Sequence, residues 1–338
     1  MAFPFLQQPL FLKSCELKNR LVLPPMATEK ASQGIVSQEL CHYYESMSHG
    51  GYLGLIFIEH SYVSPEGQAS PHQLSIADDT TISGLSRLVE VIHANGVKVI
   101  AQINHAGSAA SPNVTGLDVF GPSAVLNPAP AAKRHGGPVL PKTLSLEAID
   151  QLVQNFADAA VRAQKAGFDG VEIHSAHGYL LNQFYSPLTN QRTDTYTGSN
   201  LEGRTRLQTT ICREVRKRVG HNFLLSLRWG ACDYLEAGAS IEEIPKAAQI
   251  FADAGIDLLS ISGGMCAYNR PDHTEQGWFA ELALAARKAV SIPILLTGGI
   301  KDGQTADRFL AEGKADLIGI GRAILHDPTL PKKLLADA

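Results

Sequence analysis

The sequence predicts an α/β protein, a single (β/α)₈ TIM barrel that takes up residues 1–338. Short apolar runs alternate with segments of helical period, which is typical of parallel β-α units. The runs are continuously apolar, so both faces of each strand are expected to be covered. Eight such units in a chain of 338 residues, of which 44% are hydrophobic, suit one closed barrel.

The expected strands are short and rich in Val, Ile and Leu. In chain order they span residues 20–23, 55–58, 97–102, 170–174, 223–228, 258–262, 292–297 and 317–320. The structural rival is a doubly wound open sheet, which normally carries a glycine-rich turn after its first strand. Here the first strand is followed by Pro24-Pro25-Met26-Ala27-Thr28, without glycine, which favours the barrel.

Segments of helical period fill most gaps between the strands. They span residues 38–49, 81–94, 146–166, 201–218, 241–254, 279–289 and 305–312, with a closing helix at 328–335. Ser145 and Asn200 are good N-caps for the third and fourth of these helices. Ser240 is expected to begin the fifth helix, with Glu243 completing a capping box.

Two long loops follow the third and fourth strands. Residues 106–145 are rich in Pro, Gly and Ala and leave the C-terminal end of their strand, which is the active face of a barrel. We expect this loop to be a lid or a pocket wall. Residues 178–200 carry polar side chains that can order the second loop through internal hydrogen bonds.

Composition limits the classes of partner. Net charge is −4 and Lys and Arg form no run, so no nucleic-acid partner is expected. The longest apolar stretches are too short to span a bilayer, and the N-terminus lacks a secretory pattern. Five cysteines without a C-x-x-C pair indicate neither a disulfide framework nor a metal site. We therefore expect a cytoplasmic protein that acts on a small molecule.

Polar residues stand where the predicted strands end, and a barrel would gather them at one rim. Glycines and an arginine follow the last two strands, as Gly298, Gly299, Gly321 and Arg322. Glycine lets backbone N–H groups approach an anion closely, and arginine adds a charged contact. Loops after strands seven and eight form the usual phosphate site of such barrels, so a phosphorylated ligand is indicated.

Gln102 and Arg228 end the third and fifth strands. An amide that both donates and accepts can bind an imide edge, and a guanidinium can stabilise a ring carbonyl that gains negative charge. A flavin offers both groups. The alternative is that Gln102 is a satisfied core amide and that Arg228 pairs with an acid such as Asp233.

The most informative stretch joins His174, His177 and Tyr179 within six residues at the end of the fourth strand. Imidazoles can hold an oxygen atom that gains negative charge, and a phenol can deliver a proton. The alternative is a pair of hydrogen-bonded core histidines beside a packed tyrosine. A metal site lacks a third ligand, because Glu172 is expected on the opposite side of the strand.

Over almost its whole length the chain resembles the old yellow enzyme family of FMN-dependent NADH:flavin oxidoreductases, or ene-reductases. The matching segments are 25–26, 54–59, 63–67, 102–107, 121–123, 174–184, 186–190, 192–194, 202–204 and 321–322. The run from 174 to 204 is highly specific. The chain ends soon after residue 333, so the resemblance is to the short form, without the iron–sulfur extension of longer relatives.

The resemblance implies FMN as cofactor and assigns roles by position. Residues Pro24, Pro25, Met26 and Ala27 would line the flavin, with the backbone of His60 serving there while its ring shapes the pocket. Gln102 would bind the pyrimidine edge and Arg228 the N1–C2 carbonyl; Gly298, Gly299, Gly321 and Arg322 would hold the phosphate. His174 and His177 would bind the substrate carbonyl, and Tyr179 would protonate the carbon α to it.

The implied reaction is a ping-pong reduction of the activated C=C bond of an α,β-unsaturated carbonyl compound by NADH or NADPH. Ala27 departs from the Thr or Cys of many relatives, which leaves Thr28 as the nearest side-chain donor.

One alternative is a non-redox barrel lyase or isomerase acting on a phosphorylated substrate through Lys301. Another is a barrel that binds flavin without turnover. Relatives often form dimers or tetramers, so a homo-oligomer stays open.

Overall fold

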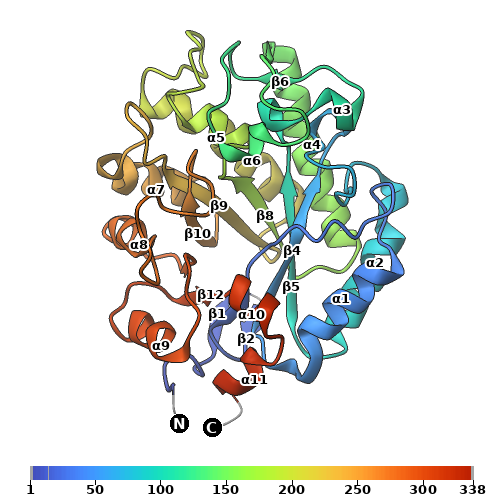
Figure 1. Ribbon diagram of the computed structural model, residues 1–338, viewed down its shortest axis with the longest axis vertical. Helices are drawn as coiled ribbons and strands as arrows, with labels where there is room; N and C mark the ends of the chain where they lie inside the picture. Colours follow the sequence, from blue (N-terminus) through green and yellow to red (C-terminus); the bar gives the residue numbers. More distant parts are fainter. Residues whose placement is uncertain (1–2, 14, 336–338) are drawn as a thin grey trace.

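The computed structural model describes residues 3–13 and 15–335. Eight parallel strands close into a barrel in chain order (Figure 1): β3 (Leu21–Leu23), β4 (Leu55–Tyr62), β5 (Lys98–Asn104), β8 (Gly170–Ser175), β9 (Leu224–Cys232), β10 (Leu258–Gly263), β11 (Ile294–Leu296) and β12 (Leu317–Gly319). The barrel closes where β12 pairs with β3, Ile318 opposite Leu21. The predicted fold class is confirmed, and each expected strand is present.

Helices surround the barrel: α1 (Gln38–Ser48), α2 (Ile82–His93), α4 (Leu146–Lys165), α6 (Leu201–Val219), α7 (Ile244–Asp253), α8 (Ala280–Arg287), α9 (Gly303–Ala311), α10 (Arg322–His326) and α11 (Leu330–Leu335). Ser145 caps α4 through the Ala148 N–H, and Asn200 caps α6 through the Gly203 N–H, as predicted. The short α10 was not predicted; α11 is the expected closing helix.

The predicted capping box at Ser240 and Glu243 is wrong. Residues Ile241–Glu243 form a single 3₁₀ turn, and α7 begins only at Ile244. The Glu243 carboxylate accepts a hydrogen bond from Arg204, whose guanidinium is almost buried on α6. A buried guanidinium without a partner costs more than an open helix cap, so the ion pair takes the carboxylate.

The lower half of the barrel interior is apolar. Leu55, Ile100 and Leu224 are among the inward residues of this layer. The hairpin of β1 (Leu10–Leu12) and β2 (Cys15–Leu17) adds Leu12 and Leu17 beneath it. Further along the same strands, towards their C-terminal ends, the buried side chains become polar: Gln102, Ser226, Arg228 and Ser260. The sequence therefore builds a closed apolar base under a polar upper chamber.

The two long loops lie at the C-terminal end of the barrel (Figure 1). The first carries α3 (Pro112–Thr115) and the short parallel pair β6 (Phe120–Gly121) and β7 (Lys142–Thr143). The second carries α5 (Leu180–Tyr185). Its expected internal order is confirmed by the Asn190 amide, which donates to Phe184 O and Tyr196 O at 2.8 and 2.9 Å.

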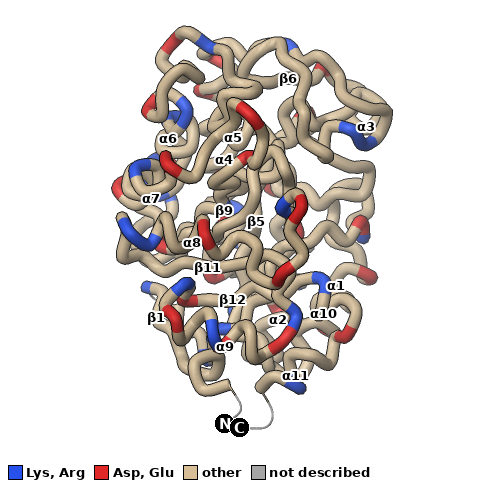
Figure 2. The backbone as a smooth tube through the Cα atoms, turned by 60° about the vertical axis from the view of Figure 1, so that its left-hand side comes forward, with Lys and Arg blue, Asp and Glu red and all other residues tan. Residues whose placement is uncertain are grey.

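Acidic and basic residues are interspersed over the chain in the view of Figure 2, rather than gathered into a face of one sign. Within residues 3–13 and 15–335, every helix is too short or too polar to cross a membrane.

Candidate active site

Three aromatic side chains predicted to act together lie in contact at the C-terminal end of β8. The ring centroid of His174 is 5.0 Å from that of His177 and 5.2 Å from that of Tyr179. His174 is 2% and Tyr179 8% exposed. The imidazole of His60, at the end of β4, joins them with its centroid 5.3 Å from that of Tyr179. The structure thus brings together these three residues, and beside them it places the His60 ring, which the family resemblance implied would shape the pocket.

A tight turn after β8 sets the directions of these rings. His177 and Gly178 have φ values of +61° and +75°, so the chain reverses there before α5. Asn182 on α5 accepts a hydrogen bond from the Gly178 N–H at 2.7 Å, and Asn127 donates to the Gly178 carbonyl at 2.8 Å. The His177 Nε2 atom lies 2.7 Å from the Ser262 hydroxyl at the end of β10.

Gly178→Ala is expected to destabilise the protein by about 1–3 kcal/mol, because the site has no room for a methyl group. A Cβ atom at this position would lie 2.1 Å from the Cβ of Ala129, and the positive φ adds strain. Thermal unfolding measures the loss. Gly116→Ala is a matched control, since Gly116 also has a positive φ but open space around it. Equal destabilisation by the two changes would contradict the steric argument.

Burial sets the protonation of the ring cluster. It lowers the pKa of His174 and of His177 well below the ordinary value, and the neighbouring histidines and Arg228 lower both further. Burial also raises the pKa of Tyr179. At neutral pH the imidazoles are therefore uncharged, each with one N–H to donate, and the phenol keeps its proton.

The expectation that Glu172 faces away from His174 is wrong. Side chains two positions apart share one face of a strand, so both project into the barrel. One carboxylate oxygen of Glu172 accepts a hydrogen bond from Gln102 Nε2 at 2.7 Å, and the other accepts from the Ser226 hydroxyl at 2.8 Å. Glu172 therefore lies in the barrel interior and not against the outer helices.

The alternative pairing of Arg228 with Asp233 is also wrong. Asp233 is buried and accepts hydrogen bonds from the Ser186 hydroxyl and from the N–H groups of Ala239 and Met265. The charge that acts on Arg228 is that of Glu172. Although Arg228 is only 4% exposed, its Nε and Nη1 atoms have no partner among the described residues.

The unpartnered polar atoms of Gln102 and Arg228 fit a flavin ring. Gln102 gives its N–H to Glu172, and within the described part of the chain its carbonyl oxygen receives no hydrogen bond. That oxygen can accept from an imide N–H, and the two unpartnered Arg228 donors can meet a ring carbonyl. Leaving buried guanidinium donors unsatisfied is costly, which is typical of a site built for a ligand.

The expected phosphate residues converge at the ends of β11 and β12. Gly298 and Gly299 have φ values of +122° and +70°. The sequence reasoning missed Trp278, whose indole lies against this turn: a Cβ on Gly299 would be 2.2 Å from it. The guanidinium of Arg322 lies 5.2 Å from the Trp278 ring. The one sequence feature that could have indicated Trp278 is that it is a tryptophan in the loop after the sixth strand.

The segment that carries Pro24, Pro25, Met26 and Ala27 leaves β3 along the same rim and is tied to β4. The Thr28 N–H donates to a carboxylate oxygen of Glu59 at 2.9 Å. The hydroxyl of Thr28, the nearest side-chain donor in place of Ala27, accepts a hydrogen bond from the Lys30 N–H at 3.3 Å. Burial raises the pKa of Glu59 to about 7.

Glu59→Gln is expected to flatten the dependence of stability on pH. Because the pKa is raised from 4.5 to about 7, the folded protein binds this proton more tightly than the unfolded chain. The associated stability is present below pH 4.5 and is lost as pH rises through 7; the difference corresponds to about 3 kcal/mol. Urea unfolding at mildly acidic and at mildly alkaline pH measures this change in the free energy of unfolding.

Glu45→Gln is the control for that experiment, since Glu45 is exposed on α1. It is expected to leave the pH dependence as in the unchanged protein. A pH dependence that is the same in Glu59→Gln as in the unchanged protein would show that Glu59 ionises normally in the fold.

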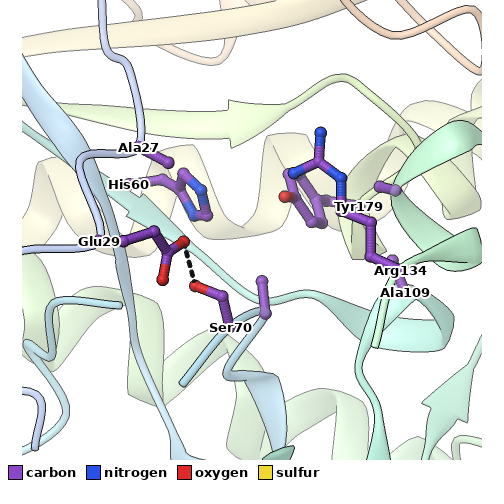
Figure 3. A pocket seen from close by; sticks show the side chains of 9 residues that line it. Ala27, Glu29, His60, Ser70, Ala109, Arg134 and Tyr179 are labelled. Atoms are coloured by element: carbon purple, nitrogen blue, oxygen red, sulfur yellow. Dashed lines mark hydrogen bonds between the residues drawn. The ribbon is translucent and has the colours of Figure 1, made fainter. Parts of the chain in front are cut away.

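A pocket opens beside the ring cluster, and Figure 3 shows its lining. Glu29 and His60 lie on one side, with Arg134 and Tyr179 on the other. Glu29 is held by the Ser70 hydroxyl, which donates to its carboxylate at 2.6 Å. Glu29 and Arg134 were not predicted; both come from loops, where no periodic pattern marks a direction.

The comparisons with known proteins agree with this architecture. The model of the NADH:flavin oxidoreductase / NADH oxidase family matches residues 5–337. An NADH oxidase of Thermoanaerobacter brockii is 40% identical over 324 residues, covering 94% of this chain and 48% of that protein. An NADPH dehydrogenase of Bacillus pumilus is 38% identical over 327 residues, covering 96% of this chain and 92% of that protein.

Among solved structures, the old yellow enzyme homologue from Zymomonas mobilis superposes with a TM-score of 0.85 at 27% identity, covering 98% of this chain and 93% of the other. The chain spans about half the length of the Thermoanaerobacter protein and nearly all of the Bacillus protein. By its matched length, its barrel and its relatives, the chain belongs to the NADH:flavin oxidoreductase / NADH oxidase family, that of the old yellow enzymes.

Proposed function

We propose that the protein is an FMN-dependent oxidoreductase that uses NADH or NADPH to reduce the activated C=C bond of α,β-unsaturated carbonyl compounds. Family membership and relatives named for NADH and NADPH support FMN as cofactor and NAD(P)H as reductant. The observation that carries the proposal is the contact between two neutral imidazoles and one protonated phenol at the rim of the barrel.

Each group of the cluster has one task in this reaction. FMN, when bound, would supply the chemistry of hydride transfer between the nicotinamide and the alkene. His174 and His177 donate hydrogen bonds to the carbonyl oxygen of the substrate, where negative charge develops as the β carbon is reduced. Because both imidazoles are neutral, they polarise the oxygen without surrendering a proton. Tyr179 holds the proton that the α carbon needs.

The cofactor would be held by residues that already line the rim. Gln102 and Arg228 would meet the pyrimidine part of the ring, and Gly298, Gly299, Gly321 and Arg322 the phosphate. The backbone of Pro24, Pro25, Met26, Ala27 and His60 would line the ring edge. A flavin against Arg228 would give its unpartnered donors the acceptors that the protein itself does not provide.

The loop of residues 106–145 is proposed as a wall of the substrate pocket. It contributes Ala109, Ala131 and Arg134 to the lining, beside Tyr179. Asn127 anchors it through hydrogen bonds to the Ser108 hydroxyl and the Gly178 carbonyl. Because this loop is hydrogen-bonded to the turn at Gly178, it helps to exclude water from the reacting atoms.

The test is a visible absorption spectrum of the purified protein, followed by anaerobic reduction with NADH or NADPH. We expect flavin absorbance that bleaches with either nucleotide and returns when cyclohexenone, maleimide or cinnamaldehyde is added. Protein that stays colourless with added FMN would instead favour a lyase or isomerase. Flavin that does not bleach would favour a binding protein. Lys301, which the lyase alternative needs, is exposed beyond β11.

A further inference from the structure

We propose that His60 is a third hydrogen-bond donor of the substrate pocket and that it selects activated alkenes that carry a second acceptor oxygen. This inference rests on the proposed function and deepens it by naming the substrate class. It concerns the side chain of His60, and not the backbone that would line the flavin.

An irregularity in β4 places the His60 ring in the barrel. Leu55 and Phe57 point into the apolar base, and strict alternation would aim Glu59 inward next. The pairing of β4 with β5 shifts between Phe57 and His60, so that His60 stands opposite Gln102. Such bulges re-aim side chains beside functional sites. The His60 ring lies 6.1 Å from that of His174, between centroids, and it lines the pocket.

The neighbours of His60 fix which ring nitrogen carries the proton. The Ala69 N–H, which can only donate, bonds to the Gln73 carbonyl oxygen at 2.6 Å. The amide nitrogen of Gln73 therefore faces His60, where it donates to Nδ1 at 2.7 Å and to the His60 carbonyl at 3.0 Å. Nδ1 must accept in this arrangement, so in the neutral ring the proton is on Nε2.

The ring is neutral at physiological pH, because burial lowers the pKa of His60 to about 4. Within residues 3–13 and 15–335, the hydrogen bonds to the ring of His60 reach Nδ1 only, from Gln73 and, at 3.4 Å, from Asn104. The Nε2–H group is thus a donor of fixed direction that has no protein acceptor. An acceptor on a bound molecule would satisfy it.

Two donor sites in one pocket define a substrate class. His174 and His177 serve the carbonyl oxygen conjugated with the reacting bond, and His60 is free for another. Cyclic ene-diones and maleimides hold two carbonyl oxygens on one small ring and match this pattern. Simple enones offer one oxygen and leave the Nε2–H of His60 without an acceptor, which lowers the preference for them.

The experiment compares two substrates of equal ring size, 4-cyclopentene-1,3-dione and 2-cyclopentenone, in the holoenzyme. The measured quantity is the ratio of their kcat/KM values, so that the greater intrinsic reactivity of the dione cancels between variants. His60→Phe keeps a planar ring and removes the donor. It is expected to lower the ratio about tenfold. His60→Gln, whose amide can still donate, is expected to restore part of the ratio.

His72→Phe is the matched control, since His72 is an exposed neighbour of Gln73 and lies outside the pocket lining. An unchanged ratio in His60→Phe would overturn the inference while leaving the proposed function intact. Loss of FMN from His60→Phe would also overturn it, because the ring would then belong to the cofactor site. Wild-type protein that bleaches with NAD(P)H but reduces neither substrate would contradict the proposed function itself.

Discussion

Tyr179→Phe is expected to slow alkene reduction by about 10²–10⁴-fold while leaving the reduction of FMN by NADH or NADPH nearly intact. The substitution removes one hydroxyl and keeps the ring that packs against His174 and His60. Only the oxidative half-reaction needs a proton at carbon, so only that half should respond. Anaerobic stopped-flow spectroscopy follows the flavin absorbance in the two halves separately.

Tyr185→Phe is the matched control for this prediction. Tyr185 is a buried tyrosine like Tyr179, but it lies on the outer side of the barrel, in contact with Trp229 and Phe251. Its hydroxyl has no partner among the described residues, so its removal is expected to affect neither half-reaction. Equal slowing of both halves by Tyr179→Phe would mean that the hydroxyl positions the cofactor rather than donating a proton.

The barrel itself could be predicted because its signal is local and repeated. Continuous apolar runs such as Leu258–Gly263 can be buried only with cover on both faces, and eight of them alternate with helical segments. The crowding of His174, His177 and Tyr179 could be predicted for a similar reason. Three residues within six positions at a strand end cannot be moved far apart by the rest of the fold.

Partners chosen across the fold could not be predicted. Glu243 fits a capping box by spacing, yet Arg204, 39 positions away, takes its carboxylate. Arg228 lies five residues before Asp233, yet the acid that acts on it is Glu172 on the neighbouring strand. A buried charge is governed by the opposite charges that the packed structure brings near it, and sequence separation carries no information about which these are.

Directions that depend on irregular backbone were equally hidden. The bulge that turns His60 into the barrel breaks the alternation on which strand predictions rely, and no turn residue marks it. That the His60 ring would shape the pocket was implied only by the family resemblance. Arg134 and Trp278 project from loops, where conformation depends on contacts made elsewhere. Arg134 lines the pocket and Trp278 lies against the turn at Gly298 and Gly299, so both residues stand where sequence patterns are weakest.

His174→Ala is expected to lower kcat/KM for cyclohexenone about 10²-fold and to weaken the binding of phenols that mimic the enolate. His174 is buried at the centre of the ring cluster, and its Nδ1 atom has no partner in the described chain. A donor already held in a water-poor site needs no reorganisation as charge develops on the substrate oxygen. Removing it therefore weakens the binding of the transition state more than the binding of the substrate. Titration with a phenol, followed by charge-transfer absorbance, measures the affinity for the phenol independently of turnover.

His174→Asn separates this role from packing. Its amide can still donate a hydrogen bond to the oxygen, so it should recover a large part of both the rate and the phenol affinity. Because His174 contacts the rings of His60, His177 and Tyr179, a purely structural residue would show similar losses with Ala and Asn. Phenol titrations of His174→Ala that match those of the unchanged protein would rule out His174 as a donor to the substrate oxygen, whatever happened to the rate.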